Sequence, residues 1–160
     1  MQSQEILQTI SQVAAALAGF SGVVAAIGHR GSRTWSSEEI LQLRTLVEPS
    51  LVALFGSFLP GTLHLAFDSE PLVWRLSNAA LGLLGVVAGA AFIARSRLAS
   101  ATIGQRVFLV PVGLAVVALL LAACGVLRQY ELIFVIALIL ALAVAAYNFL
   151  LLLVITGDAE

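Results

Sequence analysis

The residues of this 160-residue chain that could carry out chemistry are few and far apart. There is one cysteine, Cys124, and there are two histidines, His29 and His64. A metal site needs several converging ligands, and a nucleophile needs a base within reach. No spacing in the chain provides either, so we expect no metal, no cofactor, no catalytic residue and no enzymatic activity. Cys124 is expected to pack as a small apolar residue.

Glu48 is the strongest single candidate for an ion site. It lies near the start of a long apolar segment and directly before Pro49. Charged groups in such segments are costly and commonly functional. Glu48 is therefore a candidate site for a cation or a proton. The alternative is an ion pair at the membrane surface with Arg44, Arg30 or Arg95.

His64 is a second candidate, near the other end of the same segment. Sixteen residues separate it from Glu48, which is about 24 Å along a helix, so the two side chains cannot meet. The alternative role for His64 is a hydrogen bond at the membrane surface, with Asn78 as a possible partner.

A third set of candidates shares one face of the first apolar segment. Spacings of three or four residues align these side chains on a helix: Glu5, Gln8, Gln12, Ala15, Gly19, Gly22, Ala26 and Arg30. Such a stripe could face water and line a pore. Alternatively, its first turns lie at the membrane surface and its small residues form a helix-packing seam.

The elements that must position these side chains are strongly apolar. Hydrophobic residues make up 61% of the chain and charged residues 11%, and the mean hydropathy is +1.05. Soluble domains have about 25% charged residues, and a small soluble domain could not bury this much apolar surface. The net charge of −1 argues against nucleic acid as a partner, because phosphate binding needs a basic surface.

About 20 apolar residues in a helix cross the hydrocarbon layer. Five segments approach this length: 10–28, 43–67, 72–93, 107–127 and 132–155. We therefore expect an all-α integral membrane helical bundle, a single domain over residues 1–160 with five transmembrane helices. Four spans remain if the first segment lies flat. An amphipathic connecting helix is predicted from Ser36, with Glu39 completing a capping box. It runs either along the inner membrane surface or directly into the second span.

Small residues predict where the helices pack. Asn78, Gly82, Gly85 and Gly89 share one face of the third segment, where we expect a helix to dock. Asn148 shares a face with small residues of the last segment, near the opposite membrane surface from Asn78. Three small-residue seams exceed what one small bundle needs, which predicts a homo-oligomer.

The eight basic residues, all arginine, predict the orientation. Short cytoplasmic loops are enriched in basic residues. Six arginines belong to the first and third connections: Arg30, Arg33, Arg44, Arg95, Arg97 and Arg106. The second and fourth hold only Arg75 and Arg128. We therefore expect the amino terminus outside and the carboxyl terminus in the cytoplasm. The six inner arginines could bind anionic lipid head groups or form ion pairs.

Three stretches give the chain a recognisable pattern: ISQVAAALAGFSGVVAAIG, then W with EEILQLRTLVEPSL and FLP, and finally YELIFVIALILALAVAAYNFLLLL. This pattern resembles a set of small, uncharacterised bacterial multi-pass membrane proteins. The resemblance implies a bacterial inner membrane, and it implies no activity and no functional residue.

Two functions are compatible with the sequence. One is a homo-oligomeric channel or pore lined by the first segment. The other is an accessory or sensor protein that binds an unknown membrane partner by helix packing. Membrane lipids are expected neighbours in either case.

Overall fold

The protein is a bundle of long helices in its structure, a computed structural model that describes residues 2–28, 37–96 and 107–157. The helices are α1 (Gln2–Gly28), α2 (Ser37–His64), α3 (Glu70–Ser96), α5 (Leu109–Ala123) and α6 (Tyr130–Gly157). No strand occurs in these described ranges. The all-α helical bundle predicted from the sequence is confirmed.

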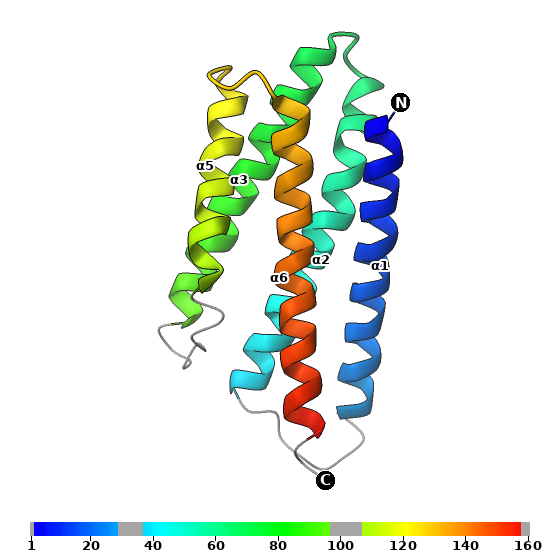
Figure 1. The fold of residues 1–160 in the computed structure, drawn as a ribbon, viewed down its shortest axis with the longest axis vertical. Helices are drawn as coiled ribbons and strands as arrows, with labels where there is room; N and C mark the ends of the chain where they lie inside the picture. The colour runs from blue at the N-terminus through cyan, green and yellow to red at the C-terminus, as the bar shows by residue number, and fades with distance from the viewer. Residues whose placement is uncertain (1, 29–36, 97–106, 158–160) are drawn as a thin grey trace.

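The helices run alternately up and down the long axis of the molecule (Figure 1). α1 begins at one end of the bundle and α6 finishes at the other. α6 packs against all four other helices, α1 packs against α2 and α6, and α3 packs closely against α5. α2 also packs against α3, so the bundle is continuous. α1, α2 and α6 are called the three-helix group below, and α3 and α5 the helix pair.

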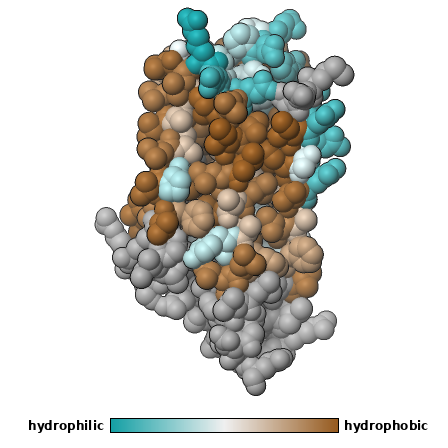
Figure 2. All heavy atoms as spheres, in the orientation of Figure 1, coloured by the Kyte–Doolittle hydropathy of each residue, from teal (hydrophilic) through white to brown (hydrophobic). Residues whose placement is uncertain are grey.

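Four of the helices, α1, α2, α3 and α6, are long and apolar enough to cross a membrane. Figure 2 shows a broad hydrophobic surface across the middle of the visible face, with hydrophilic residues gathered at one end. These features are compatible with a multi-pass membrane protein. The remaining helix, α5, is shorter than expected. Its 15 residues are about 22 Å long, whereas the hydrocarbon layer is about 30 Å thick.

α5 ends early because its carboxyl end is capped. Gly125 has a φ of +82°, a conformation that glycine adopts without strain. Its N–H donates to the carbonyl of Ala122, and the N–H of Val126 donates to the carbonyl of Leu121. These two bonds form a Schellman motif, which ends a helix. The predicted span 107–127 therefore loses its last turn. Cys124, the C-cap residue, is exposed rather than packed as expected.

α2 is one continuous helix from Ser37 to His64, with Pro49 and Pro60 inside it. The predicted amphipathic helix therefore continues directly into the second span, which was one of the two alternatives. Ser36, its predicted N-cap, lies outside the described residues. α1 begins at Gln2, before the apolar segment 10–28, so its polar first turns are helical as well.

The core lies where the three-helix group meets the helix pair. Trp74 of α3 and Phe134 of α6 pack edge to face, with ring centroids 5.8 Å apart. Leu7 and Ile10 of α1 are also buried in this core cluster. Such burial fixes the rotation of α1 about its axis and so decides which of its faces remains outside.

Candidate functional site: a polar stripe and an apolar cavity

The stripe predicted on α1 lies on the outer surface of the chain. Its described members from the first turn to the sixth are all exposed: Glu5, Gln8, Gln12, Ala15, Gly19 and Gly22. A Cβ atom added at Gly19 or Gly22 would have no atom of another element within 4 Å. The buried face of α1 instead contains Leu7, Ile10 and Ala14. Within a single chain, the stripe is therefore not a packing seam.

The stripe reaches a groove at the end of the bundle where α1 begins. Gln8 and His64 both line this groove, together with Glu70 and Trp74 of α3, and its volume is about 510 Å³. Figure 2 shows hydrophilic side chains that continue from this end down the edge of the molecule formed by α1. The structure thus brings together two candidates from different predicted segments, Gln8 of α1 and His64 of α2.

Asn78 serves as a packing residue at the same end. Its side chain is fully buried, and its Nδ2 donates to the carbonyl of Trp74 at 2.7 Å and to that of Tyr130 at 3.0 Å. The second bond ties α3 to the first residue of α6. The Oδ1 atom is buried with no hydrogen-bond partner. A bond between Asn78 and His64, which the sequence analysis allowed, is not among those recorded for the described residues.

The glycine seam of α3 is filled by α5 over its first two members. A Cβ atom at Gly82 would lie 2.9 Å from Leu120 Cδ2, and one at Gly85 would lie 2.6 Å from Val116 Cγ2. At Gly89 nothing lies within 4 Å. The helix expected to dock on this seam is therefore α5 of the same chain, and its contact stops before Gly89.

Asn148 also links two helices by a hydrogen bond, near the other end of the bundle. Thr45 Oγ1 of α2 donates to Asn148 Oδ1 at 3.0 Å, and both residues are buried. Asn148 Nδ2 donates to the carbonyl of Val144 one turn earlier. The sequence predicts a packing role for Asn148, but Thr45 was not among the predicted packing residues. The signal available was its position three residues before Glu48, on the same face of a helix.

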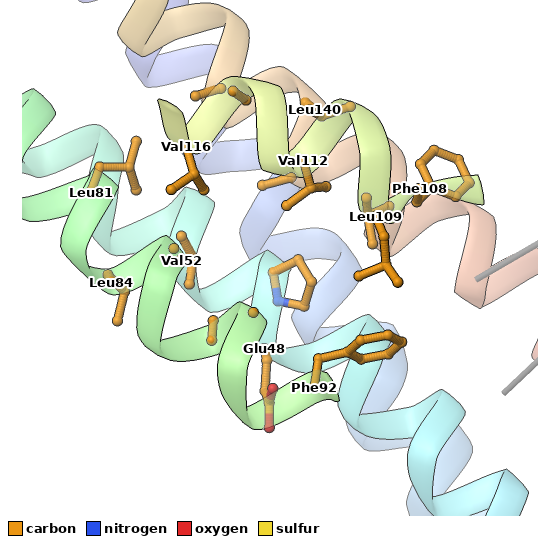
Figure 3. Close-up of a pocket in the computed structure, with 18 of the residues that line it drawn as sticks. Glu48, Val52, Leu81, Leu84, Phe92, Phe108, Leu109, Val112, Val116 and Leu140 are labelled. Atoms are coloured by element: carbon orange, nitrogen blue, oxygen red, sulfur yellow. The ribbon is translucent and has the colours of Figure 1, made fainter. Parts of the chain in front are cut away.

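Glu48 stands at the rim of a cavity between α2, α3, α5 and α6. The cavity has a volume of about 190 Å³. Of the described residues that line it, three are polar, namely Thr45, Glu48 and Asn148. Phe92 of α3 also lines the cavity, and Figure 3 shows the carboxyl group of Glu48 directed away from the side chains of α5. The remaining walls are apolar, so the cavity has one polar end and an apolar body.

The six predicted inner-surface arginines are only partly described. Arg44 is exposed near the start of α2, and no ion pair between it and Glu48 is recorded for the described residues. Arg95 belongs to the last turn of α3. α2 begins and α3 finishes at the same end of the bundle (Figure 1). The other four lie outside the described residues: Arg30, Arg33, Arg97 and Arg106.

Comparisons of the chain with protein-family models, with curated proteins and with solved structures found no match. The resemblance to small bacterial membrane proteins therefore stays a prediction. Within the described ranges, no three or more His, Cys, Asp or Glu residues are grouped so that they could hold a metal ion. The candidate features are thus the exposed α1 stripe and the cavity beside Glu48.

Proposed function

We propose that the protein is a homo-oligomeric, pore-like membrane protein in which the α1 stripes of several copies meet. The observation that carries this proposal is the exposure of the whole described stripe, including the side chains of Gln8 and Gln12. A polar amide costs free energy against lipid tails unless it has a hydrogen-bond partner. Glycine and alanine at the same face allow the backbones of neighbouring helices to come close.

The order of residues along the stripe supports a pore rather than a simple contact. Glu5, Gln8 and Gln12 cover the first part, about 10 Å of helix, and small residues follow as far as Gly22. Polar side chains would line a wide mouth, and the small residues would let the helices converge beyond it. A ring of Glu5 carboxylates at this mouth favours cations over anions.

The proposal includes a location and an orientation. We place the protein in a bacterial inner membrane with its amino terminus outside and its carboxyl terminus in the cytoplasm. The arginine distribution supports this orientation, and an odd number of helices in alternating directions is compatible with it. The mouth with Glu5 and the groove with His64 would then face outward. The proposed activity is passive and includes no catalytic step.

The test is reconstitution of the full chain into liposomes, with the oligomer measured separately by native mass spectrometry in mild detergent. We expect an oligomer and a cation flux above that of empty liposomes. Gln12→Leu should reduce the flux at least fivefold, since it removes a pore-lining amide. Val13→Leu is the control, because Val13 is exposed on a different face of α1. A monomer without flux would overturn the proposal.

One observation favours a second function, an accessory protein that binds a different membrane helix. Gly19 and Gly22 are open to a close neighbour of any identity, whereas Gly82 and Gly85 are already covered by α5. A partner helix would therefore dock on α1 and not on the α3 seam. A monomer that copurifies with one defined membrane protein, and loses it on Gly22→Leu, would support this function in place of the pore.

A further inference from the structure

The cavity beside Glu48 has the composition of a ligand site. It lies inside one chain, between α2, α3, α5 and α6, so it is independent of the α1 stripe and of any oligomer. Its volume is about 190 Å³. An enclosed apolar cavity of about 150 Å³ can take up a molecule the size of benzene. The cavity beside Glu48 is thus large enough for a hydrophobic group of at least one ring.

The packing explains why the space is open. α5 covers the α3 seam at Gly82 and Gly85 but leaves Gly89 without any atom within 4 Å of an added Cβ. Gly89 lines the cavity together with Val112 of α5 and Ala141 of α6. Facing side chains lose dispersion contacts across an empty space. A bound apolar group would restore these contacts.

The polar end of the cavity decides the charge of the ligand. Among the described residues that line the cavity, Glu48 is the only ionisable one, and Thr45 and Asn148 are neutral polar groups. A carboxylate has two oxygens with about four acceptor sites, so it can receive an ammonium group in addition to a donor from the protein. It would repel the phosphate of an anionic lipid. Phe92 lines the same cavity as Glu48, and aromatic faces attract ammonium groups.

We propose that this cavity binds a lipophilic organic cation, with an apolar body between α3, α5 and α6 and an ammonium head at Glu48. The body would rest against Val112 and Val116, the side chains that face α3 in Figure 3. The head would remain at the rim, where the carboxyl group stands. An acyl chain of a bilayer lipid is the competing occupant, and it would have no preference for positive charge.

The experiment compares two probes of nearly equal shape, 4-phenylbutylammonium and the neutral 4-phenylbutanol. Their binding to the purified full chain in mild detergent is measured by equilibrium dialysis at pH 7, with protein-free micelles subtracted. We expect the ammonium probe to bind at least tenfold more tightly than the alcohol. Equal affinities would overturn the proposal and indicate a site for acyl chains.

Two variants make the test specific. Glu48→Gln keeps the shape of the side chain and should lower the affinity for the ammonium probe to that for the alcohol. Gly89→Leu fills the cavity from α3 and should abolish binding of both probes. Circular dichroism confirms that each variant is folded, and either variant alone tests the site. An ammonium preference that survives Glu48→Gln would overturn the role of Glu48, and probe binding unchanged by Gly89→Leu would overturn the location.

Discussion

The α1 stripe and the α3 seam have the same sequence pattern and opposite surroundings. Both contain small residues spaced by three or four, on one face of a long apolar helix. On α3, Leu120 and Val116 of α5 pack against Gly82 and Gly85. A Cβ atom added at either glycine would lie less than 3.0 Å from one of these side chains. On α1, a Cβ atom added at Gly19 or Gly22 would have no neighbouring atom of the described chain within 4 Å.

The difference teaches that small residues permit a close approach but do not select the neighbour. The selection comes from the other helix, which must present a large side chain at the matching height. α5 does so for α3, whereas α2 and α6 meet a different face of α1, the one with Leu7 and Ile10. The α3 seam therefore packs against α5 within the chain, whereas the α1 stripe can pack against a helix of another chain.

The largest effect is expected from Gly85→Leu. A Cβ atom at this position would lie 2.6 Å from Val116 Cγ2, and overpacking of this kind costs about 1–3 kcal/mol. We expect the free energy of unfolding in mild detergent, measured by circular dichroism with added denaturant, to fall by that amount. The variant tests whether the α3 seam is needed for the fold of the single chain.

Gly89→Leu is the matched control on the same face of α3. Nothing lies within 4 Å of a Cβ atom there, so the free energy of unfolding should stay constant or rise slightly. Leucine is also the better helix former, by about 0.5–1 kcal/mol relative to glycine. Equal destabilisation by Gly85→Leu and Gly89→Leu would contradict the proposed contact between α3 and α5.

The next effect concerns the other side of the comparison, Gly22→Leu on α1. A Cβ atom at this position meets no atom of its own chain, so, as for Gly89→Leu, the stability of the monomer should stay constant or rise slightly. If α1 helices pack together in the oligomer, the added side chain keeps them apart. We expect the dissociation constant of the oligomer to increase at least tenfold, which is about 1.4 kcal/mol, as measured by analytical ultracentrifugation in detergent. A loss of monomer stability with unchanged assembly would reverse our assignment of the two seams.

The main features of the fold were predictable because they depend on long apolar runs. Four of the five segments correspond to helices that could cross a membrane. The end of α5 was not predictable from hydropathy, because Val126 and Leu127 continue the apolar run beyond the helix. The helix ends at the positive φ of Gly125 and its two Schellman bonds, a local backbone feature that composition does not record.

The candidate sites were predictable only in part. The stripe on α1 was found from its spacing, but its exposure depends on which face the neighbouring helices bury. Glu48 was found from its place in an apolar segment. The cavity beside it is made by side chains of four helices distant in sequence, such as Val52, Phe92, Val112 and Leu140. No spacing within one helix could have indicated that these residues surround a common space.

The smallest effect should come from Arg75, which holds one end of the α3 seam in place. Its Nε donates to the carbonyl of Ala123 at 3.0 Å, a group that α5 itself leaves without a helical donor. A cation at this end also opposes the partial negative charge of the helix terminus, which is worth about 0.5 kcal/mol at an exposed position. Arg75→Met keeps much of the aliphatic chain and removes both contributions.

The expected result of Arg75→Met is local rather than global. Hydrogen exchange of the last-turn amides of α5, measured by mass spectrometry, should become two- to threefold faster, while exchange in α1 stays the same. Arg128→Met is the control, since Arg128 is exposed in the connection that follows α5 and no hydrogen bond from it to the end of α5 is found among the described residues. Faster exchange with both variants would mean that net charge matters here, and the Arg75 bond does not. Faster exchange with Arg75→Met alone would show that the contact between α3 and α5 is stabilised by the Arg75 hydrogen bond as well as by close packing at the glycines.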